Sequence, residues 1–319
     1  MINALGLDQE QQEVVDYKDS CIVVAGPGSG KTRTLVAKAE KLWDEGRDLI
    51  CLTFTRAAAQ ELRDRMPGIT ALTIHSYCYH EVGWPGNYDK LLFEFIETPI
   101  KDRYEWTLVD EVQDLTEEEL DVCLSIVGGK LFAVGDPYQS IYGWNGALGM
   151  QVFKKLSGFR TFQLRNNYRS DTEIVRLLNC IYDRKLVSTG VVSNGLTAIL
   201  CRTNAAVREV CLILESDGVG FTRRVGASES GKTREEFFGD DKLKVMTCHC
   251  SKGLEFDTVI LYKWFPEPLW GEEMNLYYVS VARSSARFYT AALGYELRDI
   301  VKEVQRGRLR NFKAKESNS

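Results

Sequence analysis

Residues 21–32 read Cys-Ile-Val-Val-Ala-Gly-Pro-Gly-Ser-Gly-Lys-Thr, and the rest of the chain can be interpreted outward from them. The apolar run 21–25 predicts a buried strand, and apolar residues at helical spacing over 35–43 predict a helix after the glycine-rich turn. A strand, a glycine-rich turn and a helix, in that order, are typical of a phosphate-binding loop, whose backbone N–H groups and helix N-terminus face the phosphates. The residues that we predict to bind a nucleotide here are Gly26, Gly28, Ser29, Gly30, Lys31, Thr32 and Arg33.

A second candidate, residues 226–233, matches the strict pattern G-x-x-x-x-G-K-[ST] fully, whereas residues 25–32 begin with alanine in place of glycine. The context of the second candidate is poorer, because a short charged stretch precedes it and little room remains for a helix before Lys244. Glu229 would also place a negative charge beside a phosphate. We therefore predict that residues 25–32 bind the nucleotide and that residues 226–233 form a surface connection.

Residues 107–111 form an apolar run that ends in two adjacent carboxylates, Asp110 and Glu111. Beside a phosphate loop this pattern is typical of a Walker B element, in which one carboxylate holds Mg²⁺ and the next orients or deprotonates the attacking water. The alternative is an acid-rich helix N-terminus, because residues 116–119 continue the acidic run. The phosphate loop favours the hydrolase interpretation, with Asp110 on the metal and Glu111 on the water.

Further short apolar runs alternate with helical patterns along the chain. This alternation predicts an α/β fold of parallel sheets covered by helices on both faces. The predicted strands are residues 49–54, 106–109, 131–134, 159–164, 197–201, 244–246 and 258–261. A helical pattern ends near Ser157 and Gly158, so we predict two domains, residues 1–158 and 159–319, as the length of 319 residues also suggests.

The composition excludes several classes of protein. Hydrophobic residues make up 44% and charged residues 27% of the chain, as in soluble, well-packed proteins. No window approaches 18 uncharged apolar residues, and the N-terminus lacks the features of a signal peptide, so we expect no membrane partner. Nine cysteines without a CxxC pair indicate neither a disulfide framework nor a zinc cluster, and we expect a reduced, cytoplasmic protein. A net charge of −5 argues against binding of nucleic acid by bulk charge, although a local basic groove stays possible.

Short motifs follow one another in a fixed order over residues 7–283. They lie at residues 7–11, 25–32, 53–58, 73–76, 109–114, 135–144, 167–170, 202–204, 247–256 and 278–283. One phosphate loop alone is common, but this ordered set is specific. It resembles the motif set of the UvrD/Rep-type superfamily 1 helicases.

The resemblance implies two tandem RecA-like domains with a P-loop NTPase site, for ATP and Mg²⁺, in the interdomain cleft. The roles that it assigns there are adenine recognition by Gln11 and Tyr168, ribose contact by Glu255, binding of phosphate and Mg²⁺ by Lys31 and Thr32 beside Asp110, and contact with the γ-phosphate region by Gln139. Arg169 and Arg283 resemble arginine fingers, which neutralise charge as the γ-phosphate leaves.

For single-stranded DNA the resemblance indicates Phe54, Thr55, His75, Trp144 and His249. Aromatic rings stack on any base, so they hold a strand without reading its sequence. Tyr77 and Tyr142 stay open between base stacking and core packing. The run Cys248-His249-Cys250 also suggests a metal site, but along a strand alternate side chains point to opposite faces and cannot converge on one ion.

The implied function is an ATP-dependent single-stranded DNA translocase and helicase, moving 3′ to 5′ on single-stranded or tailed duplex DNA in a bacterial or phage-infected cell. Both accessory subdomains of larger family members must be absent or vestigial, and we find no room for a strand-separating hairpin after Arg283. The alternative is therefore a DNA-stimulated ATPase that remodels or strips DNA complexes and takes strand separation from a protein partner.

Two other classes explain the sequence less well. A nucleotide-gated DNA-binding module without turnover would not need the complete catalytic set. A P-loop kinase would leave the motifs of the second half unexplained.

Overall fold

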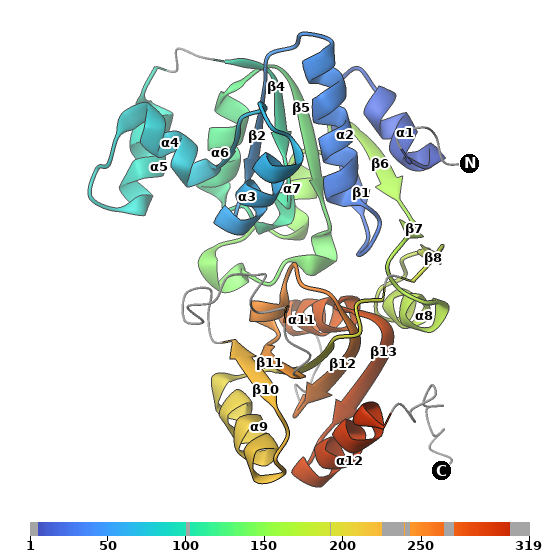
Figure 1. Cartoon of the computed structure of the whole chain (residues 1–319). Coiled ribbons are helices and arrows are strands. Elements are labelled where there is room, and N and C mark those ends of the chain that lie inside the picture. The colour runs from blue at the N-terminus through green and yellow to red at the C-terminus, as the bar shows by residue number, and fades with distance from the viewer. Residues whose placement is uncertain are drawn as a thin grey trace. The chain divides into compact units, whose positions relative to one another are not determined.

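The computed structural model describes residues 6–99, 103–191, 193–224, 239, 243–264 and 271–306. The chain divides into two compact units, Met1–Asn167 and Tyr168–Ser319, here called unit 1 and unit 2. Figure 1 shows the helices and strands of both units. Among the described residues no helix is long and apolar enough to cross a membrane. The second phosphate-loop candidate, residues 226–233, lies outside the described residues.

Unit 1 alternates strands and helices along most of its length. Its strands are β1 (Cys21–Ala25), β2 (Leu49–Thr53), β3 (Ala71–Thr73), β4 (Tyr104–Val109), β5 (Val127–Gly135), β6 (Arg160–Leu164) and β7 (Asn166–Asn167). Its α-helices are α1 (Gln9–Asp16), α2 (Lys31–Asp44), α3 (Arg56–Arg65), α4 (Ile74–Val82), α5 (Tyr88–Glu97), α6 (Glu117–Ser125) and α7 (Met150–Lys155). Short 3₁₀ turns are η1 (Val112–Asp114), η2 (Pro137–Gln139) and η3 (Gly143–Asn145).

A parallel sheet forms the centre of unit 1. Among the described residues its strands follow the order β3-β2-β4-β5-β1-β6, and neighbouring strands run parallel. Ile22 of β1 joins an apolar cluster with α4 to α7, whereas Cys21 and Val23 join a second cluster with α1, α2 and α3. Alternate residues of a strand point to opposite faces, so helices cover both faces of the sheet. This explains why the strands read as continuous apolar runs.

The parallel arrangement brings the ends of β1 to β5 to the same edge of the sheet. We call the segments directly after these five strands the carboxyl edge of unit 1. The phosphate loop follows β1, Phe54 follows β2, His75 comes just after β3, Asp110 follows β4, and Gln139 comes shortly after β5. This edge of the sheet therefore carries most candidate residues of unit 1, whereas Gln11 lies on α1 (Gln9–Asp16). Ligand sites of open α/β sheets generally lie at such an edge.

Unit 2 is built on a second parallel sheet. Its strands are β8 (Val187–Ser188), β9 (Thr197–Cys201), β10 (Phe221–Arg224), β11 (Leu243–Thr247), β12 (Phe256–Tyr262) and β13 (Ser284–Ala291). Its helices are α8 (Thr172–Ile181), α9 (Asn204–Ser216), η4 (His249–Ser251), α11 (Gly271–Ala282) and α12 (Gly294–Gln305). Within the described part of the chain the sheet order is β10-β11-β9-β12-β13, with parallel pairs throughout.

Both faces of the second sheet are also buried. Ile260 and Tyr262 of β12 share an apolar cluster with α9 and α12. Val259 and Leu261, which alternate with them, are equally buried, and α8 and α11 pack together and against β13. The predicted α/β fold of parallel sheets with helices on both faces is thus confirmed.

The sequence placed the domain boundary too early. β6 pairs with β1 from Cys21↔Arg160 to Ala25↔Leu164, so this strand completes the sheet of unit 1. The division falls between Asn167 and Tyr168 rather than after Gly158. A strand that pairs far back along the chain shows no local sign of the sheet to which it belongs, and the predicted boundary was wrong for this reason.

Candidate nucleotide and nucleic-acid site

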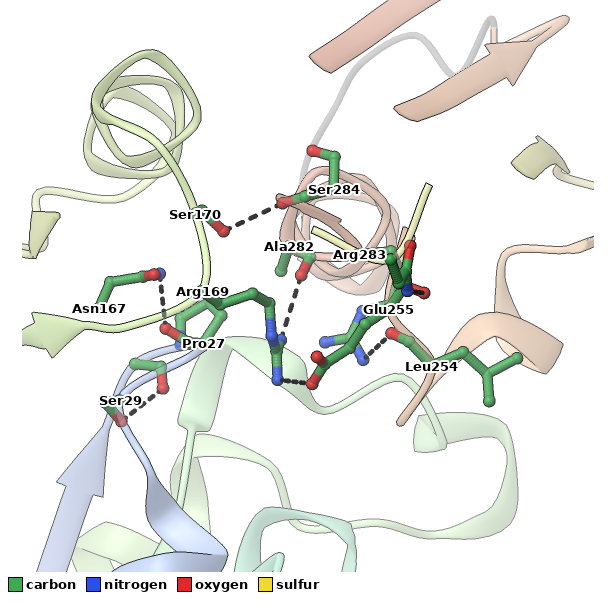
Figure 2. Close-up of polar contacts among 12 residues, drawn as sticks. Pro27, Ser29, Asn167, Arg169, Ser170, Leu254, Glu255, Ala282, Arg283 and Ser284 are labelled. Atoms are coloured by element: carbon green, nitrogen blue, oxygen red, sulfur yellow. Dashed lines mark hydrogen bonds and ion pairs between the residues drawn. The ribbon is translucent and has the colours of Figure 1, made fainter. Parts of the chain in front are cut away.

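The phosphate-loop candidate joins β1 to α2 through glycines in the left-handed region. Gly28 has φ +65°, and Gly30, the N-cap of α2, has φ +78°; residues with side chains rarely adopt such values. A Cβ at Gly30 would also lie 2.6 Å from Nε2 of Gln11. Ser29 is buried, and its Oγ donates to the carbonyl of Gly26 at 2.7 Å (Figure 2). The loop is therefore a tight turn that leads straight into the open N–H groups at the start of α2.

Gln11 lies against this loop from the side of α1. Its Nε2 donates to the carbonyl of Ser29 at 3.0 Å. Its Oε1 accepts the N–H of Asp8 at 3.1 Å, while Oδ1 of Asp8 accepts the N–H of Gln11 at 2.7 Å. This reciprocal pair is a capping box at the start of α1. Gln11 is thus brought to the loop backbone, and its contact with adenine stays a prediction.

The last two residues of unit 1 reach back to the same region. Nδ2 of Asn167 donates to the carbonyl of Pro27 at 2.8 Å, as Figure 2 shows. Nδ2 of Asn166 donates to Oδ2 of Asp8 at 2.7 Å. The phosphate loop is therefore bonded to the segment where the chain leaves unit 1.

The three residues that open α2 differ in exposure. Lys31 and Thr32 are half-buried, and Arg33 is exposed. The Arg33 guanidinium lies against Gly6, where a Cβ would come within 2.1 Å of Nη2. Lys31 and Thr32 thus stand at the helix N-terminus predicted to face the phosphates, whereas Arg33 turns toward the segment before α1.

Asp110 and Glu111 lie at the end of β4, as a Walker B element requires. Oγ1 of Thr32 donates to Oδ2 of Asp110 at 3.5 Å, across 78 residues of chain. Burial, and next the negative charge of Glu111, raise the pKa of Asp110 well above its usual range, against the opposing charge of Lys31. A buried carboxylate whose charge is this costly would be stabilised by a bound cation.

The backbone at Glu111 adopts an uncommon conformation. Its φ is +52° and its ψ 43°, which is the left-handed region for a residue with a long side chain. Such a position costs on the order of 1 kcal/mol or more and occurs preferentially at functional sites. The turn directs the chain from the end of β4 into η1.

Gln113 connects Glu111 to the segment after β5. Its Nε2 donates to Oε2 of Glu111 at 2.7 Å, and its Oε1 accepts the N–H of Asp136 at 3.0 Å. Asp136 in turn accepts a hydrogen bond from Nε2 of Gln139 at 2.9 Å, on Oδ2. Gln113 is fully buried and Gln139 nearly so. The predicted water-orienting carboxylate and the predicted γ-phosphate contact are therefore joined by one hydrogen-bonded chain.

Aromatic side chains meet at the carboxyl edge of unit 1. The ring centroids of Phe54 and Tyr142 are 5.5 Å apart, and those of Tyr142 and Trp144 are 6.3 Å apart. Trp144 is 71% exposed, so its ring lies open to solvent beside this cluster. Thr55, the other candidate in this segment, is the N-cap of α3 and accepts the N–H of Ala58. Tyr142, which the sequence left open, belongs to this cluster.

His75 and Tyr77 differ although they lie two residues apart on α4. Tyr77 is 2% exposed and packs against Phe95 and Tyr104, so the core interpretation holds for it. His75 is partly exposed, and its ring lies edge-on to Tyr88 at 5.3 Å. Its Nδ1 is 3.3 Å from Oε1 of Glu119.

In unit 2 the predicted arginine fingers lie near the amino ends of β12 and β13. Arg169 forms an ion pair with Glu255, and its Nη1 donates to the carbonyl of Ala282 at 3.4 Å (Figure 2). Arg283 is 3% exposed, and it donates to the carbonyls of Val279 and Leu254 at 3.2 and 3.3 Å. The structure thus brings together three residues to which the resemblance assigned separate nucleotide contacts. Tyr168, the fourth such residue of unit 2, is half-buried at the start of the unit.

His249 lies on η4, just after the end of β11, rather than on a strand. The argument from strand alternation against a metal site therefore does not apply to this segment. Burial, and next the positive charge of Arg202, lower the pKa of His249, and burial raises the pKa of the Cys248 thiol to about 12. Among the described residues no group of three histidine, cysteine or carboxylate side chains could hold a metal ion.

Two family models match this chain. Residues 10–145 match an AAA domain, and residues 220–293 match the UvrD-like helicase C-terminal domain. Through these matches the chain is similar to the UvrD/Rep-type superfamily 1 helicases. The UvrD-like match lies in the half of the chain that carries Arg283.

Relatives of this chain are found among bacterial helicases. A probable DNA helicase of Mycoplasma pneumoniae is 27% identical over 233 residues, which are 60% of this chain and 44% of that protein. DNA helicase II of Escherichia coli (strain K12) is 35% identical over 88 residues, 26% of this chain and 12% of the relative. The chain therefore spans less than half the length of the relatives that it matches.

Solved structures support the fold of this chain. Arterivirus nonstructural protein 10, a helicase, has a TM-score of 0.50 at 16% identity, covering 88% of this chain and 61% of that one. A Pif1 helicase structure also has a TM-score of 0.50, at 15% identity, covering 94% of this chain and 98% of that one. At such low identity the likeness concerns the fold alone.

The sequence assigned no role to three residues that the structure brings into contact with predicted site residues, namely Gln113, Asp136 and Glu119. Gln113 and Asp136 stood inside the quoted motifs but received no role. Glu119 was considered only as part of an acidic helix start. The pattern Thr116-x-x-Glu119 is that of a capping box, which the structure contains, and this signal could have separated Glu119 from its exposed neighbours.

Proposed function

We propose that this chain is an ATP-driven motor that moves 3′ to 5′ along single-stranded DNA and has DNA helicase activity. The observation that carries the proposal is the contact of Thr32 with Asp110, which joins the start of α2 to the end of β4. A hydroxyl at the start of the phosphate-loop helix and a buried carboxylate at the end of a neighbouring strand form the metal-binding half of a P-loop hydrolase.

The residues of unit 1 fit ATP and Mg²⁺ by their chemistry. Gly28 and Gly30 adopt the positive φ values that let the backbone approach phosphate oxygens closely. Thr32 and Asp110 supply the oxygen ligands that Mg²⁺ prefers alongside phosphate. Bound Mg²⁺ would neutralise charge on the phosphates. Lys31 would bind the phosphates, and Gln11 would contact the adenine.

Glu111 is proposed to orient the attacking water and to accept its proton. The amide of Gln113 donates to this carboxylate at 2.7 Å and thus fixes its direction. Gln139 would contact the γ-phosphate region and, through Asp136, connect it to the same amide. The protein's part in hydrolysis is therefore positioning, which supplies much of the rate in phosphoryl transfer.

Single-stranded DNA is proposed to bind at the carboxyl edge of unit 1. The exposed ring of Trp144 and the adjoining rings of Phe54 and Tyr142 support this proposal, because stacking on aromatic faces tolerates every base. Thr55 and His75, also at this edge, and His249 of unit 2 are proposed as further contacts.

The test is the ATPase rate with and without single-stranded DNA for the wild type, Lys31→Ala and Lys232→Ala. We expect DNA to stimulate the wild type strongly, and Lys31→Ala to abolish turnover because the phosphates lose their cation. Lys232, of the second phosphate-loop candidate, serves as the matched control and should retain wild-type turnover. Absence of DNA stimulation would contradict the proposed motor function. Loss of turnover in Lys232→Ala would indicate that residues 226–233, and not residues 25–32, bind the nucleotide.

The arginine-finger role of Arg283 has its own test. We expect Arg283→Ala to lower kcat by about 10³-fold, as loss of an arginine finger does, with little change in nucleotide affinity. Arg287, half-buried on the adjoining strand β13, is the matched control. Wild-type kcat in Arg283→Ala would contradict the assignment, and an equal loss in Arg287→Ala would indicate damage to the strand instead.

A remodelling ATPase that unwinds poorly on its own is the second candidate. It is favoured by the segment after Arg283, which forms β13 and α12 within unit 2. Strand displacement on a tailed duplex distinguishes the two candidates. Stimulated ATPase without displacement would favour remodelling with a protein partner, and displacement by the chain alone would favour the helicase.

A further inference from the structure

A buried carboxylate lies directly behind the partly exposed His75. The side chain of Glu119 is 1% exposed and that of His75 30% exposed, with Nδ1 of His75 3.3 Å from Oε1 of Glu119. The two residues come from different helices, α4 and α6, which pack in the same apolar cluster of unit 1. The contact therefore joins a residue at the carboxyl edge of unit 1 to the interior.

The two oxygens of Glu119 have separate environments. Oε2 accepts the N–H of Thr116 at 2.9 Å and completes the capping box of α6. Oε1 is buried and accepts no hydrogen bond among the described residues. A buried acceptor without a donor is costly, and a proton on Nδ1 of His75 would supply both a donor and a compensating charge. The capping box therefore accounts for the position of Oε2 but not for the burial of Oε1.

The charges around Glu119 make the histidine more important. Asp114 on η1 and Glu118 on α6 are both acidic and disfavour its ionised form. The thiols of Cys78 on α4 and Cys123 on α6 also face it, and burial holds both in their neutral form. Burial and these acidic neighbours raise the pKa of Glu119 to about 7. Among these groups only His75 can offer a positive charge.

We propose that Glu119 is a positioning residue for nucleic-acid binding: it holds His75 as the imidazolium, with Nδ1 turned toward the protein, and so keeps a positive charge at the carboxyl edge of unit 1. The inference rests on the proposed function, because it takes the DNA strand to lie along this edge. The ligand is the phosphate backbone or a base edge of single-stranded DNA. A negative charge at Glu119 thus strengthens the binding of a polyanion.

That a negative charge strengthens the binding of a polyanion is the opposite of what net charge alone predicts, so the two expectations can be distinguished by experiment. Removing an acidic residue ordinarily favours a polyanion. Glu119→Gln should instead weaken binding at pH 7.5, because the imidazole loses the carboxylate that keeps it protonated. At pH 5.5 a histidine is protonated without help, so the defect should disappear. The side-chain amide oxygen introduced by Glu119→Gln can still accept the N–H of Thr116, so α6 keeps its cap.

The experiment measures the Kd of a labelled oligothymidylate at pH 5.5, 6.5 and 7.5. The variants are Glu119→Gln, His75→Gln, the double variant, and Glu118→Gln as an exposed control on the same helix. We expect Glu119→Gln to weaken binding about fivefold at pH 7.5 and not at pH 5.5, and to have no effect in the His75→Gln background. Glu118→Gln should bind as the wild type or slightly more tightly.

Equal weakening by Glu119→Gln at every pH, or in both backgrounds, would overturn the inference and leave Glu119 as a helix cap. A DNA-free measurement tests the same contact independently, namely NMR titration of the histidine rings. The chain has three histidines, and His75→Gln assigns the relevant signal. We expect Glu119→Gln to lower the titration midpoint of His75 by about one pH unit; an unchanged midpoint overturns the inference. If the wild type binds no oligothymidylate, the proposed function fails, while the NMR result still decides whether Glu119 holds the imidazolium.

Discussion

Two separate constraints require glycine at position 30. Its φ is +78°, and a Cβ there would lie 2.6 Å from Nε2 of Gln11. Gly46 has a similar φ of +72°, but nothing lies within 4 Å of its Cβ position. We expect Gly46→Ala to lower the free energy of unfolding by about 1 kcal/mol through backbone strain, and Gly30→Ala by about 2 kcal/mol or more because Gln11 must also move. Urea unfolding measures both losses, and equal values would contradict the steric constraint.

Single residues differ in how far the sequence could place them. The places of Lys31 at the start of α2 and of Asp110 and Glu111 after β4 were predictable, because each belongs to a short motif whose spacing is fixed by local backbone. Their roles stay predictions. The bond from Gln113 to Asp136 was not predictable, because it joins segments 23 residues apart through side-chain packing. Tyr77 could not be assigned either, since a tyrosine in a motif reads the same whether its ring faces the core or a ligand.

At the scale of elements, the side chain of Lys38 on α2 forms hydrogen bonds with the end of α1. Its Nζ is buried, donates to the carbonyls of Val15 and Tyr17, and lies 4.5 Å from the ring centre of Trp106. Burial lowers the pKa of Lys38 from 10.5 to about 8. Between these pH values the unfolded chain binds a proton that the folded chain has lost, so stability rises with pH across this range.

The Lys38→Met variant should lack this rise of the free energy of unfolding with pH. We expect the wild type to gain about 1–3 kcal/mol over the variant between pH 8 and pH 10.5, measured by urea unfolding. Lys41→Met is the matched control, because Lys41 lies on the same helix in a surface ion pair with Asp16. Its pH dependence should follow that of the wild type. If the Lys38→Met protein keeps the wild-type slope of unfolding free energy against pH, a group other than Lys38 causes the pH dependence.

At the scale of the whole molecule, each unit has its own apolar core. Ile50 of β2 lies in a cluster of unit 1 and Ile199 of β9 in the cluster of unit 2, both fully buried. Either isoleucine to alanine change should cost about 2–5 kcal/mol. We expect each to lower the melting temperature of its own unit and to leave the other unchanged, as followed by calorimetry. A common shift of the entire transition would contradict independent cores.

The two sheets could be predicted from the sequence, but the boundary between the two units could not. Alternating strands and helices predicted both sheets, because strands buried on two faces read as apolar runs. The boundary could not be predicted, because β6 is assigned to unit 1 by its pairing with β1 and by nothing in its own residues.

The hydrogen bond between Asn167 and Pro27 has a consequence for the proposed motor. Asn167 is the last residue of unit 1, and its amide holds the carbonyl of the phosphate loop. Any displacement of that loop pulls directly on the covalent joint to the rest of the chain. Because the joint is bonded to the proposed nucleotide-binding loop, we expect a change at the loop to act on the peptide segment that leads into unit 2.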